Sequence, residues 1–374
     1  MTMMQAARIH EYGDTSVIRY EAVPRPRPSF GEVLIHVAGT SFNPTEADLR
    51  AGLLQAFFAV DLPYVPGWDV AGTVAEIGAG AEGFAVGDRV IGRLDSGGVA
   101  AEYVRAPAAV LVAAPTSIPL ATAGALPVAG LTAWQAVFEH GKVAAGQQVL
   151  VNGAGGGVGG FVVQLAKHAG AEVIATASPR STAAVLWQGA DQVIDYTAKP
   201  VGVALDGPMD TLLNLVPLSP PDVTALAPLV RPGGRIISIA TPIEPAAESG
   251  MSAMHMVARN DVGHLASTSA SHVHWPTSRA STTSANPDGP EARSSSSLEP
   301  GRRSRVPRQP VTGHVRVYLA EHFDEHADTG PPGPSGPHTQ PSGPPIRRLR
   351  AIAQYPVCRG LYADHADYRE EWRP

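Results

Sequence analysis

The fold of this chain is decided by the stretch Val149-Leu150-Val151-Asn152-Gly153-Ala154-Gly155-Gly156-Gly157-Val158-Gly159-Gly160. Its first three residues are apolar, which predicts a buried strand. The glycines let the backbone turn sharply and approach a bound group without a Cβ in the way. An apolar segment, 161–169, follows and predicts a helix that ends at Gly170. This order predicts a site where a helix N-terminus binds the phosphates of a dinucleotide. The alternative is a glycine-rich loop without a ligand.

The segment 126–266 repeats this alternation of strands and helices. Predominantly apolar runs occur at 148–151, 172–175, 192–194, 211–213 and 235–239. Strands without polar alternation are typical of a parallel sheet that helices cover on both faces. The sequence Arg231-Pro232-Gly233-Gly234 predicts a tight turn into the last strand. We therefore predict a doubly wound α/β domain over residues 126–266.

The first 125 residues have a different pattern. Short β-rich runs at 32–37, 70–77 and 88–91 are separated by Gly and Pro. This pattern predicts an antiparallel, barrel-like domain over residues 1–125.

The end of the second strand indicates which dinucleotide binds. An NAD site usually has a carboxylate about 20 residues after the glycines, where it holds the ribose hydroxyls. Here Ser178 and Arg180 occupy that region, and no Asp or Glu does. A hydroxyl and a planar cation suit a 2′-phosphate, so the sequence favours NADP(H). The alternative is that Arg180 is simply a solvated loop residue.

Residues 4 to about 266 resemble the zinc-independent medium-chain dehydrogenase/reductase family, in its quinone oxidoreductase-like branch. The resemblance rests on the glycine turn Gly153 to Gly159 and on five further segments, at 28–34, 42–44, 66–72, 98–104 and 130–134. It implies an α/β protein with a GroES-like β-barrel domain and a Rossmann domain. The active site is then expected between the two domains.

The resemblance also implies roles for individual residues. It places Gly156, Gly157, Val158 and Gly159 on the pyrophosphate, and Ser178, Arg180 and Tyr196 around the 2′-phosphate. It places Thr132, Asn214 and Ile239 near the nicotinamide half of the cofactor. It places Asn43 beside the substrate carbonyl, where an amide N–H would stabilise growing negative charge. An Asx turn before Pro44 is an equal alternative for Asn43, and Glu46 has no assigned role.

Zinc is not expected. Zinc-containing relatives have Gly-His-Glu where this chain has Gly67-Trp68-Asp69. The single cysteine, Cys358, cannot build a cysteine-based zinc site. Without a metal, alcohol oxidation loses its Lewis acid. We therefore expect hydride transfer from NADPH to a quinone or an activated enone, a small-molecule substrate. The alternative is an NADPH-binding protein without turnover, acting as a sensor, a structural protein or a damaged remnant of the reductase.

Composition excludes other classes of function. The 374 residues include 28 Lys and Arg against 34 Asp and Glu, so no strongly basic face for nucleic acid is expected. No long uninterrupted apolar stretch predicts a membrane span, and no signal peptide is expected at the start. The cysteine count favours a cytoplasmic location. By resemblance, a homodimer formed through edge strands of the Rossmann sheet is expected.

Residues 267–374 depart from the family pattern. They are rich in Ser, Pro, Arg and Gly, which predicts disorder except for a possible helix or strand fragment at 315–323. We also hypothesise that this tail is translated out of frame. His274-Trp275-Pro276 read from the third base of each codon encodes Leu-Ala, and relatives often have Leu-Ala or Leu-Thr before a closing Gly-Lys-Ile strand. A natural disordered extension is the alternative.

Overall fold

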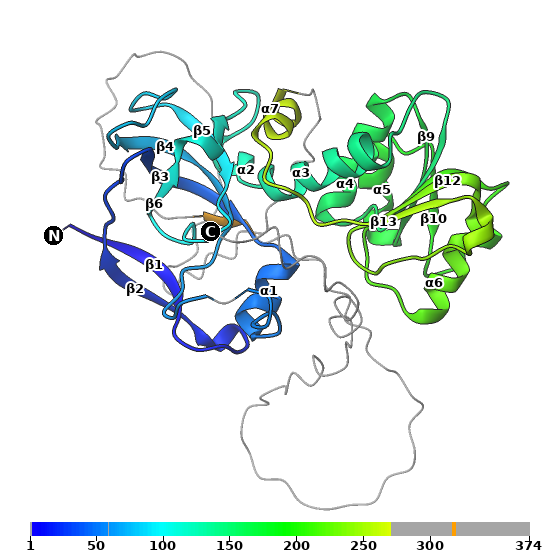
Figure 1. Ribbon diagram of the computed structural model, residues 1–374, viewed down its shortest axis with the longest axis horizontal. Coiled ribbons are helices and arrows are strands. Elements are labelled where there is room, and N and C mark those ends of the chain that lie inside the picture. The colour runs from blue at the N-terminus through cyan, green and yellow to red at the C-terminus, as the bar shows by residue number, and fades with distance from the viewer. Residues whose placement is uncertain (1, 59, 271–315, 319–374) are drawn as a thin grey trace, which may run out of the picture.

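The computed structural model describes residues 2–58, 60–270 and 316–318, the last three by their backbone only. Within these residues the chain forms two lobes, each built on a β-sheet (Figure 1). The predicted α/β class with a barrel-like domain and a parallel sheet is confirmed.

The first lobe is antiparallel. Strands β1 (Met3–Ile9) and β2 (Ile18–Pro24) form a two-stranded sheet. A larger sheet has the order β14-β3-β4-β5-β7, with β6 also pairing β3. Its members are β3 (Glu32–Ser41), β4 (Asp69–Ile77), β5 (Arg89–Arg93), β6 (Tyr103–Pro107), β7 (Leu111–Ala113) and β14 (Arg316–Tyr318). Alternate side chains of β3, such as Val33 and Ile35, are buried in its core, as period-two strands require.

The second lobe is a six-stranded parallel sheet of order β10-β9-β8-β11-β12-β13. This is the strand order of a Rossmann fold. Its strands are β8 (Gln148–Asn152), β9 (Glu172–Ala177), β10 (Gln192–Asp195), β11 (Met209–Asn214), β12 (Val230–Ser238) and β13 (Ser252–His255).

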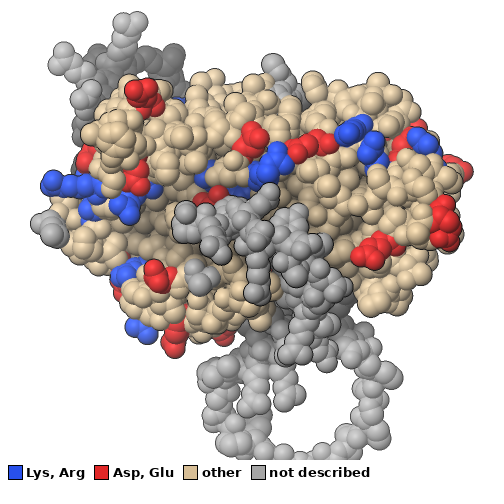
Figure 2. Space-filling model, in the orientation of Figure 1, with Lys and Arg blue, Asp and Glu red and all other residues tan. Residues whose placement is uncertain are grey.

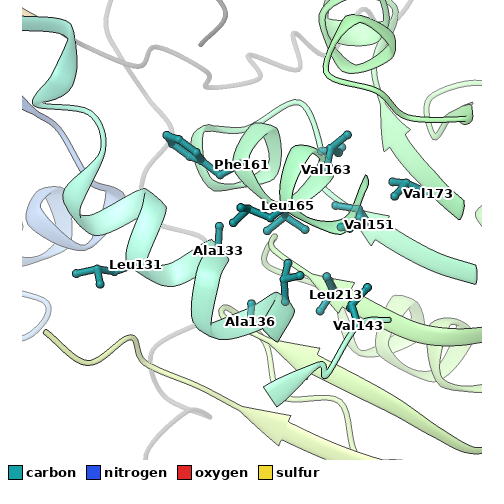
Figure 3. Packing of buried hydrophobic residues seen from close by; sticks show 14 of the residues in the cluster. Leu131, Ala133, Ala136, Val143, Val151, Phe161, Val163, Leu165, Val173 and Leu213 are labelled. Atoms are coloured by element: carbon teal, nitrogen blue, oxygen red, sulfur yellow. The ribbon is translucent and has the colours of Figure 1, made fainter. Parts of the chain in front are cut away.

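Helices cover both faces of this sheet. They are α3 (Pro127–Trp134), α4 (Gly157–His168), α5 (Pro179–Trp187) and α6 (Pro220–Leu226). Val151 of β8 faces a cluster that includes Phe161 and Leu165 of α4 (Figure 3). Leu150, the residue before it, faces the opposite cluster with Leu226 of α6. Both faces being buried explains why the middle residues of these strands are mostly apolar.

Among the described residues, several hydrogen bonds join the lobes, and two of them involve the charged side chains of Asp69 and Arg93. Asp69 at the start of β4 accepts a hydrogen bond from the backbone N–H of Val128, in the first turn of α3, at 2.6 Å. Arg93 of β5 donates to the carbonyl of Ala258 at 2.7 Å, just after β13. Helix α7 (Val262–Ala270) then lies back against α3 and β7. The chain thus crosses from the first lobe to the second and returns.

The structure corrects three expectations. Helix α4 begins at Gly157, because the glycines after Gly156 are already helical. The segment 231–234 is a bulge within β12, where the pairing register with β11 shifts, and not a turn before it. Residues 267–270, predicted as disordered, continue α7 because Leu265 and Thr268 are buried.

The rest of the predicted tail lies outside the described residues, and so does the frameshift hypothesis. The exception is β14, which falls within the predicted fragment at 315–323 and pairs in parallel with β3. Strands β10 and β13 are the two described edges of the Rossmann sheet, and dimer formation through β13 stays a prediction. No described helix combines the length and apolar character that a membrane crossing needs.

Charge is mixed on the surface. On the face that Figure 2 shows, Lys and Arg of the described residues lie among Asp and Glu instead of forming one continuous basic patch. This distribution matches the slight acidic excess of the sequence, which has a formal net charge of −6.

Replacing Leu165 with alanine tests the packing of α4 on the sheet. Leu165 is fully buried, so we expect its loss to lower the free energy of unfolding by about 2–5 kcal/mol. The matched control is Leu186→Ala on α5, where 49% of the residue is exposed and the cost should stay below about 1 kcal/mol. Urea denaturation measures both, and equal costs would contradict this packing.

Candidate functional site

The glycine turn lies between β8 and α4, at the carboxyl edge of the Rossmann sheet. Gly153 has φ +92°, a left-handed conformation that favours glycine. A Cβ on Gly159 would lie 2.5 Å from the carbonyl oxygen of Gly153 and 2.6 Å from Ala154 Cα. Only glycine allows the first turn of α4 to pack this closely on the turn before it.

The outer side of the same turn is open. Gly156 is the N-cap of α4, and both Gly156 and Gly157 are exposed. A Cβ on Gly157 would meet no atom within 4 Å. The first backbone N–H groups of a helix have no partner within the helix and carry its positive dipole end. The turn therefore fits the pyrophosphate of a dinucleotide, with Gly156, Gly157 and Val158 nearest to it and Gly159 buried behind.

The residues predicted for the 2′-phosphate come together at one edge. Ala177 and Asp195 are paired in register at the ends of β9 and β10, so Ser178 and Tyr196 follow adjacent strands. Ser178 is the N-cap of α5 and makes no side-chain capping bond. Arg180 is exposed in the first turn of that helix. No carboxylate occurs between Glu172 and Asp191.

The residues predicted for the nicotinamide half are less accessible. The hydroxyl of Thr132 donates to the carbonyl of Val128 within α3, at 2.7 Å. Asn214 is fully buried, so its side chain lies behind the surface that a cofactor would contact. Ile239 is half-buried and follows β12, and its N–H donates to the carbonyl of Asn214. Direct contact by Asn214 is therefore not supported, because neighbouring strands enclose it.

A buried acid cluster surrounds Asn43, the N-cap of α1 (Pro44–Ala51). The amide nitrogen of Asn43 donates to Glu46 Oε2 at 2.9 Å and to Asp69 Oδ2 at 3.0 Å. Glu46 also accepts from the backbone N–H groups of Asn43 and Gly67, at 3.1 and 2.8 Å. Asp69 accepts a very short hydrogen bond from the hydroxyl of Ser41. Sequence reasoning had assigned Glu46 and Asp69 no role.

This cluster changes the chemistry expected of Asn43. An amide has two N–H donors, and here both point at carboxylates. In the capping box of α1 the Asn43 side chain also faces the backbone N–H of Glu46, which its oxygen Oδ1 accepts. In this conformation neither N–H of Asn43 is left for a substrate oxygen, so the donor role predicted from the sequence would require one of these hydrogen bonds to break. The physical reason is that two buried carboxylates require donors.

The acidity of both carboxyls is altered by the fold. Burial raises the pKa of Glu46 to about 7, the charge of Asp69 raises it as well, and hydrogen bonds from Asn43 and Gly67 oppose the rise. Burial likewise raises the pKa of Asp69 above its ordinary value, against the hydrogen bonds from Ser41, Asn43 and Val128. The cluster therefore holds protons more strongly than exposed carboxyls do.

Trp68 lies between these acids in sequence and packs beside a small core formed by Ile9, Leu49, Leu54 and Tyr64. Its indole N–H is buried without a hydrogen-bond partner among the described residues. In the described part of the chain, no three His, Cys, Asp or Glu side chains form a group that could hold a metal ion. His36 is exposed and lies against Tyr103, with ring centroids 4.9 Å apart.

Two family models match the two lobes. The model described as alcohol dehydrogenase GroES-like domain matches residues 29–116. The model described as zinc-binding dehydrogenase matches residues 157–277. The second match begins at the first helical residue of the glycine turn.

Curated relatives point to one branch of this family. The chain is 38% identical over 217 residues to the chloroplast envelope quinone oxidoreductase homolog of Arabidopsis thaliana. This alignment covers 55% of this chain and 65% of the relative. The chain thus spans slightly less than two thirds of that protein. It is 34% identical over 249 residues to quinone-oxidoreductase QR1, chloroplastic, of Triphysaria versicolor, covering 63% of this chain and 75% of the relative.

A solved structure supports the same assignment. The quinone oxidoreductase from Coxiella burnetii aligns with a TM-score of 0.64 and 28% identity, over 72% of this chain and 87% of that one. The likeness therefore extends over both lobes. By sequence and by fold, the chain belongs to the medium-chain dehydrogenase/reductase family, in its quinone oxidoreductase-like branch.

Proposed function

We propose that this protein is an NADPH-dependent, zinc-independent oxidoreductase that transfers hydride to a quinone or an activated enone. The observation that carries the proposal is the open helix N-terminus at Gly157 together with Ser178 and Arg180 at the next strand end. The quinone names of its relatives support the substrate class.

The preference for NADPH rests on charge. A 2′-phosphate carries negative charge that the ribose hydroxyls of NADH lack, and Arg180 offers a planar cation for it. A carboxylate in this region would repel that phosphate, and none occurs between Glu172 and Asp191.

Zinc independence rests on the donor set around Asn43. Trp68 stands where zinc-containing relatives have a histidine. Both carboxylates nearby are already engaged, since each oxygen of Glu46 and of Asp69 accepts at least one hydrogen bond. A metal at this position would have to displace those donors.

In this proposal the bound cofactor supplies the hydride, and the chain supplies binding and orientation. The turn at Gly156 and Gly157 holds the pyrophosphate. The proton that completes the reduction comes from solvent.

A second function is favoured by one observation. Both N–H donors of Asn43 are engaged by carboxylates, so this amide stabilises no substrate oxygen in the described conformation. An NADPH-binding protein without turnover would have this property. Steady-state assays with a panel of quinones and enones separate the two functions, because tight NADPH binding without turnover would leave only the second.

Replacing Gly157 with glutamate should hinder binding of the cofactor's phosphates. We expect Gly157→Glu to weaken NADPH binding about tenfold or more, because its carboxylate repels the pyrophosphate at the helix N-terminus. The same charge favours the helix itself, so the free energy of unfolding should not fall. The control is Gly207→Glu, at an exposed loop glycine where a Cβ also meets nothing within 4 Å. Fluorescence titration measures both, and unchanged affinity in Gly157→Glu would contradict the proposed site.

Removing Arg180 should reduce the preference for NADPH over NADH. Since a charged hydrogen bond contributes about 1.5–3 kcal/mol, Arg180→Ala should weaken NADPH binding about tenfold to a hundredfold. NADH binding should not change. Arg19→Ala, at an exposed residue of β2, is the matched control. If the wild-type chain binds NADH as tightly as NADPH, the assignment of Ser178 and Arg180 is wrong.

The acid cluster predicts how stability depends on pH. The pKa of Glu46 is about 7 in the folded chain against an ordinary value of 4.5, so the folded state binds more protons between these values. The free energy of unfolding should therefore fall as the pH rises from about 4.5 to about 7, by up to about 3 kcal/mol for this group.

Glu46→Gln should remove this share of the slope and leave the share that Asp69 contributes. The control is Glu82→Gln at an exposed position, which should keep the wild-type slope. Denaturation at a series of pH values measures the slope. A variant slope equal to that of the wild type would show that Glu46 does not titrate in this range.

A further inference from the structure

A row of polar side chains crosses the carboxyl edge of the Rossmann sheet. Its members are Thr176 on β9, Asn152 on β8, Asn214 on β11 and Ser238 on β12. We call these four residues the strand-end chain. They occupy one register row, because Asn214 pairs with both Asn152 and Ser238, and Thr176 is the residue after the Val151–Ala175 pair. All four are buried, with exposed fractions between 0% and 7%.

The side chains of this row are hydrogen bonded to one another. Thr176 Oγ1 donates to Asn152 Oδ1 at 2.8 Å. Asn152 Nδ2 donates to Asn214 Oδ1 at 2.9 Å, and Asn214 Nδ2 donates to Ser238 Oγ at 3.0 Å. Every donor points in the same direction, from β9 towards β12. Hydrogen bonds arranged in this way polarise one another in a buried setting.

The strand-end chain is continued by backbone groups at both ends. At one end the N–H of Gly153, the first glycine of the turn, donates to Thr176 Oγ1 at 2.9 Å. At the other end Ser238 Oγ donates to the carbonyl of Thr241 at 2.6 Å. The row therefore joins the glycine turn to the segment 238–241, which includes Ile239.

The need to pair buried polar groups does not by itself explain why polar side chains occupy this row. Apart from Thr211, apolar side chains fill the rest of the interior of these four strands. Replacing both members of a buried hydrogen bond by apolar groups costs little. Here four successive strands all place a polar side chain in the same row. The pattern connects two places that a bound dinucleotide would contact at opposite ends.

We propose that the strand-end chain is a positioning unit that couples the two ends of the cofactor site. Thr176, Asn152, Asn214 and Ser238 hold the glycine turn and the segment 238–241 in one relative position, so a change at either end alters binding at the other. This inference rests on the proposed dinucleotide site. It assigns these residues no direct contact with the cofactor.

The test uses a cofactor fragment that lacks the nicotinamide end. The probe is 2′-phospho-ADP-ribose, which would contact the glycine turn and the Arg180 edge but not segment 238–241. Ser238→Ala removes the acceptor of Asn214 at the far end of the row. We expect this variant to bind the fragment about fivefold more weakly, the effect of losing one buried hydrogen bond. Ser238→Thr keeps the hydroxyl and should restore wild-type binding.

A double-mutant cycle identifies the coupling. Thr176→Val interrupts the row at its other end and keeps the side-chain shape. If the row acts as a unit, the double variant Thr176→Val, Ser238→Ala binds the fragment no more weakly than the weaker single variant, within about twofold. If the two losses multiply, the residues act independently and the proposal is overturned. It is also overturned if Ser238→Ala weakens NADPH binding and leaves fragment binding unchanged.

Two controls keep the outcomes distinct. The first control is denaturation without ligand, which shows whether each variant folds. If Ser238→Ala does not fold, the second control replaces it: binding of 1-benzyl-1,4-dihydronicotinamide is measured in Thr176→Val. That probe has no phosphate, and coupling is reciprocal, so its binding should weaken in Thr176→Val as well. Unchanged binding would overturn the proposal. If the wild-type chain binds neither NADPH nor NADH, the result contradicts the proposed function instead. If it prefers NADH, the same test is made with ADP-ribose in place of 2′-phospho-ADP-ribose.

Discussion

The close approach of α4 to the glycine turn is the constraint on which the rest of the site depends. A methyl group at Gly159 would collide with the carbonyl of Gly153, so any other residue would push the helix away from the end of β8. With glycine there, the N-terminus of the helix lies at the carboxyl edge of the sheet and its outer side at Gly157 stays open. The phosphate site, the adjoining Arg180 edge and the buried row beneath them all take their positions from this contact.

The two lobes are joined by a hydrogen bond to the carboxyl group of Asp69 as well as by packing. Asp69 belongs to the antiparallel lobe, yet one of its oxygens accepts from the first turn of α3 in the other lobe. Its second oxygen helps to engage Asn43, which also donates to Glu46. The position of the candidate substrate residue is therefore linked to the junction between the lobes, and burial makes both carboxyls bind protons more tightly.

Much of the fold could be predicted, because it depends on patterns that are local in the chain. Mostly apolar strands such as 148–151 and 172–175 predicted a sheet covered on both faces. The glycine turn predicted the succession of strand, turn and helix at the start of the domain. The family resemblance placed Ser178 and Tyr196 at one site, and the structure brings them to one edge because adjacent parallel strands end there. The start of α4 was misplaced because glycine has a low intrinsic helix propensity, and here packing on the turn outweighs it. The bulge at 231–234 was missed because strand pairing depends on a distant partner.

The sequence by itself determined the family, the two-lobe architecture and a glycine-rich turn between strand and helix, followed by a strand end without a carboxylate. Each of these follows from residue types at fixed spacing along the chain. Only the tertiary structure decided which polar groups face one another. Asn43, Glu46 and Asp69 are up to 26 residues apart, and Thr176, Asn152, Asn214 and Ser238 lie on four strands. Hydrogen bonds depend on distance and direction in space, and folding alone brings these donors and acceptors within reach.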